Sequence, residues 1–364
     1  MSVRGWAWRM VKPDAPLEVA EINLTPGPGE VVVGVAGCGI CHTDLGFLFG
    51  GVRTRRALPV TLGHEVSGTV VEAGKGARLQ SGETLHPGTA VVVPAVLPCG
   101  ECVICRSGRD NICPTQVMPG NDLDGGFATH LLLPARFLIP AGPLPAGHEL
   151  RDLAVVADAV TTPYQALLRA RVEREDRVVI IGAGGIGIYG VQIAAAWGAS
   201  VLAVDLDPAR AARTREFGAC ATVATRGLDD DGARAAVRAA AKQAGWGADG
   251  WKVLEMSGSA PGQRLAFSLL TRGGTLGIVG FTRDKVELRL SNLMAFDADA
   301  FGSWGCSPRH YPAVLTLLRE GKVQVRPFIS SHALADLRAL LDLAHAGRLD
   351  TRPVLVPGEK PPTH

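Results

Sequence analysis

The stretch from Val178 to Asp207 constrains the fold of this 364-residue chain more than any other. An apolar, β-branched run over Val178–Ile181 leads into the glycine-rich turn Gly182–Gly187. A helical stretch to Trp197 follows, and a second apolar run ends at Asp205. This order predicts a strand, a tight turn, a crossover helix and a parallel second strand.

A membrane-spanning helix is the alternative reading of this stretch, because residues 178–204 carry no charge. The glycines, Gln192 and the acidic pair Asp205 and Asp207 argue against it. They favour two buried strands of a parallel sheet joined by a helix.

The turn fits the spacing G-x-G-x-x-G, and each glycine has a physical role. Gly182 permits the tight turn, Gly184 lets backbone N–H groups approach a pyrophosphate at a helix N-terminus, and Gly187 lets helix and strand pack closely. Asp205 suits the free 2′-hydroxyl of an adenosine ribose and repels a 2′-phosphate. We therefore predict NAD binding by Gly182, Gly184, Gly185, Ile186, Gly187 and Asp205.

Length and charge limit the remaining classes. The chain is long enough for two cores. Its 37 basic and 35 acidic residues give a formal charge of +2, which provides no global argument for a nucleic acid or membrane partner. The N-terminal residues lack the long apolar region of a secretory signal. We expect a cytoplasmic protein.

The pattern along the chain predicts an α/β protein of two domains. Residues 1–158 contain short β-type runs between glycine- and proline-rich turns, which indicates a barrel-like, β-rich domain. Residues 159–300 alternate strands with helices, which indicates a doubly wound parallel sheet of the Rossmann type. Helical patterns around Pro312–Glu320 and Leu334–Ala346, within residues 301–364, are expected to return to the first domain.

Four cysteines form a compact motif, Cys99-x-x-Cys102-x-x-Cys105-x7-Cys113. Four thiolates on one loop suffice for a closed tetrahedral zinc site, which would order the loop and leave no position for a substrate. Buried free cysteines and an iron–sulfur cluster are the alternatives.

A second, dispersed set of residues offers a different kind of metal site. A catalytic zinc needs three protein ligands and one open position for an alcohol oxygen. Cys41, His64 and Asp158 are candidates for these ligands.

Several motifs together resemble the zinc-dependent medium-chain alcohol dehydrogenase family over essentially the whole chain. They occur in the family's order: Cys41-His-Thr-Asp44, Gly63-His-Glu65, the four-cysteine loop, Gly125-Gly-Phe-Ala128 and the glycine turn. The resemblance implies an NAD-dependent enzyme acting on a CH–OH group, with one catalytic and one structural zinc per chain, assembled as a dimer or tetramer.

The same resemblance implies roles for individual residues. Cys41 and His64 become ligands of the catalytic zinc, and Glu65 becomes a nearby acid. Thr43 provides the hydroxyl beside the reacting oxygen, and His42 either takes part in proton transfer or faces the pyrophosphate. Thr162 contacts the nicotinamide side of the cofactor, and Arg210 contacts the adenosine ribose.

Two departures from the family pattern bear on the metal site. Asp158 stands where many members have a third ligand cysteine, which makes the site harder; direct ligation, a water-mediated contact and a metal-poor site all stay open. Gly46 stands where some members carry a proton-relay histidine, so the proton route to solvent is unassigned.

Longer strings are similar to a narrower subgroup, which oxidises a cyclic hydroxyacyl-CoA in anaerobic benzoyl-CoA degradation. The strings are Gly51–Thr54, Met118–Asp122, Ala157–Tyr164, Leu290–Asp297 and Trp304–Cys306. They imply an acyl-CoA substrate. The basic group Arg53, Arg55 and Arg56 suits CoA phosphates, and a solvated charged turn is the alternative.

Two other functions stay open. A generic secondary-alcohol or polyol dehydrogenase would use the same scaffold. A non-catalytic dinucleotide-binding sensor would need only the glycine turn and one zinc.

Overall fold

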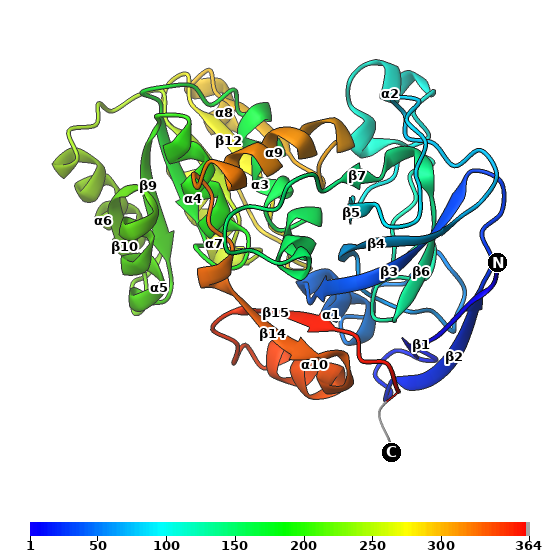
Figure 1. The fold of residues 1–364 in the computed structure, drawn as a ribbon. Coiled ribbons are helices and arrows are strands. Elements are labelled where there is room, and N and C mark those ends of the chain that lie inside the picture. Colours follow the sequence, from blue (N-terminus) through cyan, green and yellow to red (C-terminus); the bar gives the residue numbers. More distant parts are fainter. Residues whose placement is uncertain (362–364) are drawn as a thin grey trace. The chain divides into compact units, whose positions relative to one another are not determined.

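The computed structural model describes residues 1–361, which form two compact units (Figure 1). The first unit contains Met1–Thr161, Gly305–Arg319 and the chain from Val325 onward. The second contains Thr162–Trp304 and Glu320–Gln324. The boundaries expected from the sequence lay after residue 158 and before residue 301.

The segment Glu320–Gln324 groups with the second unit, which was not expected. The reason is a pair of hydrogen bonds to a buried side chain. The Gln192 amide nitrogen donates to the Gln324 carbonyl at 3.2 Å, and its oxygen accepts from the Gln324 N–H at 2.7 Å.

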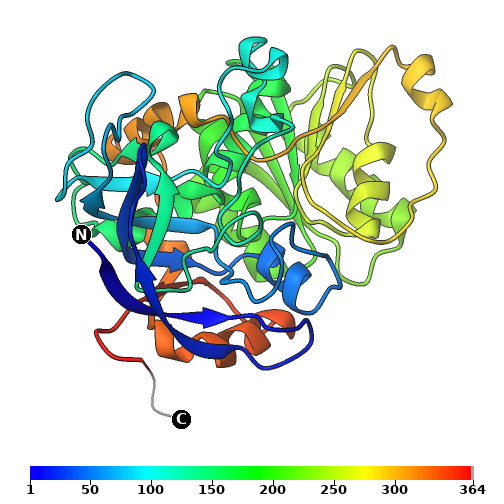
Figure 2. The ribbon, with the colours of Figure 1, turned by 90° about the vertical axis from the view of Figure 1, so that its right-hand side faces the viewer.

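A bent sheet and a separate hairpin form the β-rich first unit. In the sheet the strand order is β14-β15-β3-β4-β5-β7, and β6 also pairs with β3. The hairpin of β1 and β2 is drawn in dark blue in Figure 2. The strands are β1 (Val3–Arg9), β2 (Glu18–Leu24), β3 (Glu30–Gly39), β4 (Glu65–Ala73), β5 (Ala90–Val93), β6 (His130–Pro134), β7 (Ile139–Pro140), β14 (Ile329–Ala333) and β15 (Arg352–Val356).

The long strand β3 explains why this sheet is barrel-like. One end of β3 pairs with β6 at Glu30–Gly34, and the other end pairs with β15 at Cys38 and Gly39. Its register with β4 shifts twice. Such irregularities bend a strand and increase its twist, so β3 can serve two partners in turn.

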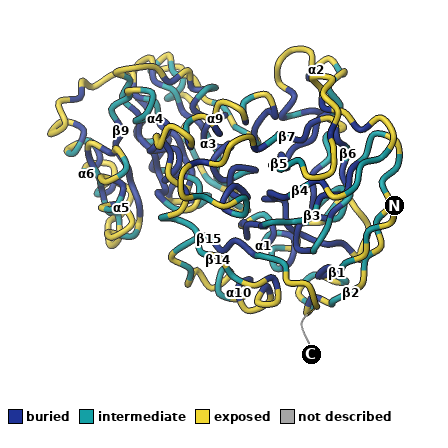
Figure 3. Tube along the Cα trace, in the orientation of Figure 1, coloured by how far each residue is buried: buried dark blue, intermediate teal, exposed yellow. Residues whose placement is uncertain are grey.

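Short helices complete the first unit around the bent sheet. They are α1 (His42–Leu48), α2 (Val103–Arg106), α9 (Tyr311–Arg319) and α10 (Leu337–His345), with 3₁₀ turns at Asp110–Ile112, Ala135–Phe137, Leu150–Ala157, Pro308–His310, Arg326–Phe328 and Leu334–Asp336. The helical patterns expected near Pro312–Glu320 and Leu334–Ala346 correspond to α9 and α10. Figure 3 shows that the buried residues of this unit follow its central strands.

The second unit is built on a six-stranded parallel sheet of order β10-β9-β8-β11-β12-β13. The order reverses beside β8, as in a doubly wound sheet. The strands are β8 (Arg177–Ile181), β9 (Ser200–Asp205), β10 (Ala219–Ala224), β11 (Lys252–Glu255), β12 (Thr275–Ile278) and β13 (Asp299–Gly302).

Helices cover both faces of this sheet. Val179 shares a core cluster with residues of α6 and α7. The next side chain, Ile180, lies against the start of α4. Because side chains alternate along a strand, α4 lies on the opposite face from α6 and α7. The helices are α3 (Thr161–Arg169), α4 (Gly187–Ala196), α5 (Pro208–Arg213), α6 (Asp230–Gln243), α7 (Ala260–Ser268) and α8 (Ser291–Ala295), with a 3₁₀ turn at Thr214–Phe217.

The predicted strand, turn, helix and strand around the glycine motif correspond to β8, α4 and β9. Across residues 1–361, none of the helices has the length and apolar character needed to span a bilayer. The α/β fold with a parallel Rossmann-type sheet is therefore confirmed.

Candidate metal centres and dinucleotide site

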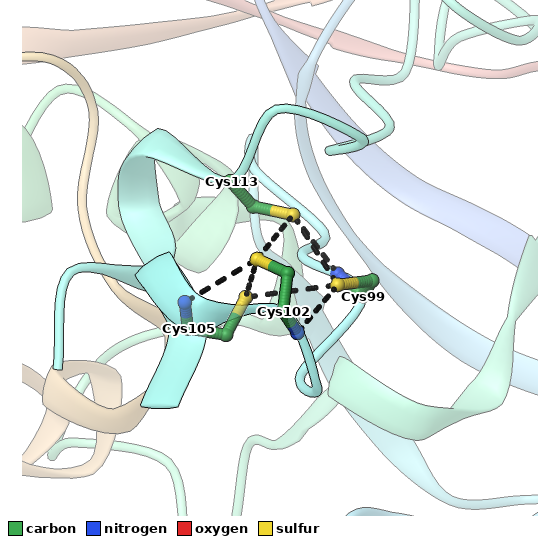
Figure 4. Close-up of side chains that lie close together, drawn as sticks. All are labelled: Cys99, Cys102, Cys105 and Cys113. Carbon is green, nitrogen blue, oxygen red and sulfur yellow. Dashed lines mark hydrogen bonds between the residues drawn. The ribbon is translucent and has the colours of Figure 1, made fainter. Parts of the chain in front are cut away.

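The four cysteines of the predicted structural site converge on one point (Figure 4). Neighbouring sulfur atoms lie 3.5 Å apart for Cys102 and Cys105 and for Cys99 and Cys113, 3.8 Å for Cys99 and Cys105, and 3.9 Å for Cys102 and Cys113. A tetrahedron with zinc–sulfur bonds of about 2.3 Å has edges of about 3.8 Å. The sulfur positions therefore fit a zinc ion.

The surroundings of two of these thiols shift their pKa values in opposite directions. Hydrogen bonds from the backbone of Glu101 and Cys102 lower the pKa of Cys99 to about 6. Burial raises the pKa of Cys105 to about 12. Since the thiolate is the ligand form, Cys99 offers a ready anion at neutral pH, and a cation would assist ionisation of Cys105.

The dispersed residues of the second site also come together within the first unit. Single ligand atoms of Cys41, His64, Glu65 and Asp158 all lie within 4.8 Å of one another. The Cys41 sulfur is 3.7 Å from Asp158 Oδ2, and His64 Nε2 is 3.6 Å from the same oxygen. The structure thus brings together the three predicted ligands with Glu65.

Asp44 contacts two of these predicted ligands, a role that we did not predict from its motif. One carboxylate oxygen accepts from the Cys41 N–H at 3.0 Å, which closes a capping box at the start of α1. The other oxygen accepts from the Gly63 N–H at 3.1 Å and lies 3.4 Å from His64 Nδ1. The spacing Cys-x-x-Asp was the available signal, because it places the acid at the third helical position.

His64 provides the test of whether a metal fits. Its side chain is 1% exposed, and neither ring nitrogen has a hydrogen-bond partner within the described chain. An unpaired buried polar atom costs free energy. A cation shared by His64 Nε2, the Cys41 sulfur and the Asp158 carboxylate would satisfy Nε2, while Nδ1 faces Asp44, so these residues fit a zinc ion.

Electrostatics favours a cation at this cluster. Burial by itself lowers the pKa of His64, but the charges of Asp44 and Cys41 outweigh it and raise the pKa well above its usual value. The anionic groups around the ring therefore attract a positive charge, which a proton provides when no metal is bound.

Glu65 is held by a buried ion pair that no local sequence pattern predicted. Its Oε1 lies 2.6 Å from Nη1 of Arg352. Gly39 stands between β4 and β15, and a Cβ there would lie 2.2 Å from Glu65 Oε2. Burial raises the pKa of Glu65 to about 7, against the opposing charge of Arg352. Arg352 thus positions a carboxyl group beside the cluster.

Two further predicted residues lie on the first turn of α1. The Thr43 hydroxyl is 3.8 Å from the Cys41 sulfur, so it is within reach of a group bound at the cluster. The His42 side chain is exposed, and partial desolvation and the charge of Arg352 lower its pKa. A neutral His42 can accept a proton.

A bound zinc would supply Lewis acidity toward an alcohol oxygen.

In the glycine turn of the second unit, Gly182 and Gly187 meet the steric requirements predicted for them. Gly182 has a φ of +88°, and a Cβ at Gly187 would lie 1.7 Å from the Gly182 carbonyl oxygen. Gly184 differs, because the nearest atom to its Cβ position is Arg210 Nη1 at 3.8 Å. Packing therefore does not require glycine at 184, whereas close approach of a ligand does.

The end of α4 next to this turn suits an anion. Among the described residues no side chain caps the helix at Ile186. A helix N-terminus with uncapped N–H groups attracts phosphate, and the guanidinium of Arg210 adds positive charge near Gly184.

Asp205 and Thr162 complete the expected cofactor residues. The Asp205 carboxylate accepts from the N–H groups of Ala183 and Asp207, each at 2.8 Å, so it is fixed beside the glycine turn. Thr162 is buried in the first turn of α3, where the next residue, Pro163, lies against Gly190 of α4.

Two arginines of the basic turn considered for CoA phosphates already face carboxylates. Arg55 lies 3.4 Å from Asp122, and Arg56 lies 3.2 Å from Asp124. The amide oxygen of Asn121 accepts from the Arg55 N–H at 3.0 Å. These contacts join two loops, and Arg53 is the member of the group for which no ion pair is found among residues 1–361.

Comparison with known proteins agrees with this geometry. The family profile "Alcohol dehydrogenase GroES-like domain" matches residues 27–145, and "Zinc-binding dehydrogenase" matches residues 185–320. An alcohol dehydrogenase of Geobacillus stearothermophilus is 30% identical over 341 residues, covering 93% of this chain and 95% of that protein. L-galactonate-5-dehydrogenase of Escherichia coli is 30% identical over 302 residues, covering 82% of each chain.

Solved structures give the same result. The crystal structure of an alcohol dehydrogenase from Thermotoga maritima superposes with a TM-score of 0.87 at 25% identity, covering 98% of this chain and 100% of that one. The sequence matches, the fold and the two candidate metal clusters leave the sensor hypothesis without support. The chain therefore belongs to the zinc-dependent medium-chain alcohol dehydrogenase family, whose members act on CH–OH groups with zinc and a nicotinamide dinucleotide as cofactors.

Proposed function

We propose that this chain uses NAD to oxidise the ring hydroxyl of 6-hydroxycyclohex-1-ene-1-carbonyl-CoA to the 6-oxo product, a step of anaerobic benzoyl-CoA degradation. The alternative is a generic secondary-alcohol or polyol dehydrogenase on the same scaffold. Both share one chemistry, which is hydride transfer from a carbinol carbon to the nicotinamide.

The observation that supports this chemistry most strongly is the cluster of Cys41, His64, Glu65 and Asp158 within 4.8 Å. We propose that Cys41, His64 and Asp158 hold the catalytic zinc and that Cys99, Cys102, Cys105 and Cys113 hold a structural one. Thr43 accepts the hydroxyl proton and passes it on. The protein otherwise fixes distance and orientation for the hydride step.

The acyl-CoA substrate rests on the sequence strings that resemble the narrower subgroup. The basic turn adds less support than its composition suggested, because Arg55 and Arg56 already face carboxylates. Arg53 is left as the guanidinium that can pair with a CoA phosphate.

The polyol alternative rests on the relatives. The Geobacillus protein is an alcohol dehydrogenase, and the Escherichia protein is an L-galactonate-5-dehydrogenase, at the same level of identity to this chain. A shared identity of 30% does not distinguish a ring alcohol from a sugar acid.

The test is NADH formation by the zinc-loaded protein with three substrate classes: the cyclic hydroxyacyl-CoA, straight-chain 3-hydroxyacyl-CoA esters, and free cyclic alcohols and polyols. Turnover confined to the cyclic thioester supports the proposal. Turnover of free alcohols or polyols alone refutes the CoA substrate and keeps the dehydrogenase.

The control is His64→Ala, which removes a proposed ligand. Mutating a residue that only supports a metal ligand typically lowers activity by up to about 100-fold. Removing a ligand itself should therefore reduce turnover with every substrate by more than about 100-fold. Full activity in this variant would remove the proposed metal site.

A further inference from the structure

We propose that Tyr311 is a positioning residue for Asp158, and that the turn Ser307–Tyr311 links this carboxylate to the four-cysteine loop. The inference rests on the proposal that Asp158 ligates the catalytic metal. It concerns the ligand for which this chain departs from the family pattern.

Asp158 has less local support than the other proposed ligands. Cys41 caps α1, and His64 is followed directly by β4. Asp158 instead follows the 3₁₀ turn Leu150–Ala157 and precedes α3, with its side chain 15% exposed. The contacts that hold the backbone at Ala157 and Asp158 therefore contribute to the direction of this side chain, together with its own contacts to Cys41 and His64.

Tyr311 holds that backbone from a distant part of the sequence. Its side chain is fully buried at the start of α9. The phenolic hydroxyl donates to the Ala157 carbonyl and accepts from the Ala95 N–H at 3.3 Å. The Thr161 hydroxyl is 3.4 Å from the carbonyl oxygens of both Ala157 and Asp158. A buried hydroxyl without hydrogen-bond partners costs free energy, so these bonds favour this one position of the Tyr311 side chain.

The same turn is attached to the four-cysteine loop two residues earlier. Arg309 Nη2 lies 3.0 Å from Oδ2 of Asp110, a buried residue between Cys105 and Cys113. The Asp110 carbonyl accepts from the Cys113 N–H at 3.1 Å. The Ser307 hydroxyl accepts from the Arg309 N–H at 3.4 Å, which stiffens the turn.

A continuous set of contacts therefore joins the two metal sites within the first unit. It runs from Cys113 through Asp110 and Arg309 to Tyr311, and from there to the peptide that carries Asp158. Ordering the cysteine loop orders the turn, and the turn restricts the Asp158 carboxylate to the cluster. Outer partners of this kind typically change metal affinity by about 10–100-fold.

The experiment compares Tyr311→Phe with the wild type after cobalt(II) has replaced the catalytic zinc. Tyr311→Phe removes the hydroxyl and keeps the ring. We expect a changed visible absorption spectrum of the cobalt site and release of cobalt to a chelator faster by about 10-fold. Tyr189→Phe, the same change at another buried tyrosine in the second unit, should match the wild type in both readouts.

Two results separate the inference from the proposed function. Asp158→Asn should alter the cobalt spectrum more than Tyr311→Phe does. An unchanged spectrum in Asp158→Asn refutes ligation by Asp158. An altered spectrum in Asp158→Asn with wild-type behaviour in Tyr311→Phe refutes the positioning role alone.

A double-mutant cycle with Arg309→Gln tests the link to the cysteine loop. If Tyr311 and Arg309 act as one unit, the double variant releases cobalt no faster than Tyr311→Phe by itself. Effects on the release rate that multiply would overturn the link.

Discussion

Asp205 offers a test of cofactor choice at the scale of one residue. Replacing it by glycine removes an acceptor for the ribose hydroxyls and the fixed contacts to Ala183 and Asp207. Hydrogen bonds to charged groups contribute about 1.5–3 kcal/mol, so the dissociation constant for NAD should rise by about 10- to 100-fold. NADP should be affected less, because the repulsion of its 2′-phosphate is relieved.

Fluorescence titration of each cofactor gives the two constants. Asp205→Asn is the matched control, since it keeps the shape and one acceptor and removes the charge. An unchanged NAD affinity in Asp205→Gly would refute the ribose role.

Glu255 makes a second residue-scale prediction, which concerns stability. The side chain is fully buried at the end of β11, and burial raises its pKa although Ser257 and Gly258 donate to it. A carboxyl whose pKa is raised on folding stabilises the protein below its unfolded pKa, near 4.5. That contribution is lost as the pH rises through the folded pKa.

Glu255→Gln keeps one acceptor and cannot ionise. Relative to the wild type, the free energy of unfolding of this variant should therefore increase as the pH rises from about 4.5 toward neutral. Urea unfolding across that range measures the difference. A difference that does not depend on pH would contradict the raised pKa.

At the scale of an element, we expect the order of the four-cysteine loop to depend on a bound zinc ion. Between Cys99 and Cys113 it contains one turn of α2 and a 3₁₀ turn, which are too short to persist by themselves. Cys102→Ser should remove one zinc per chain, leave the second, and lower the midpoint of thermal unfolding by several degrees.

The exposed thiol of Cys220 provides the control for this element. Cys220→Ser should keep two zinc ions and the wild-type midpoint. Two zinc ions remaining in Cys102→Ser would show that the loop is not a zinc site.

At the scale of the whole molecule, we predict that the homo-oligomer expected from the family forms through the sheet edge of the second unit. Strand β13 ends the six-stranded sheet and is mostly exposed. The chain before it exposes Phe281, Leu290 and Met294 at 75%, 66% and 77%, and Trp304, just after it, is 51% exposed. An exposed edge strand is a template for pairing with a second copy, and exposed apolar side chains favour such an association.

Light scattering after gel filtration measures the mass of the assembly and so tests this interface. Met294→Glu places a charge in the apolar surface and should shift an oligomer toward smaller species. Leu206→Glu, at an apolar residue that is 62% exposed elsewhere in the same unit, should leave the mass unchanged. A wild-type protein that is already monomeric would contradict the prediction.

The sequence by itself determined the elements whose physics is local. The strand, glycine turn and helix around Gly182–Gly187 follow from hydrophobic period and from the steric limits of a tight turn. The four-cysteine site lies within one short loop, so its spacing was sufficient to predict it. Cys41, His64 and Asp158 were named through family motifs, and their approach in space was not derivable from spacing.

Only the tertiary structure decided the contacts between distant residues. Cys41 meets Asp158 across 117 residues. Arg352 meets Glu65 across 287 residues, because β15, β3 and β4 lie side by side at Gly39. Asp44 likewise contacts His64, and Tyr311 contacts Ala157, each outside its own segment of the chain. Such contacts form when strands pair and the core packs. The hydrophobic period along the chain does not indicate which strands become neighbours.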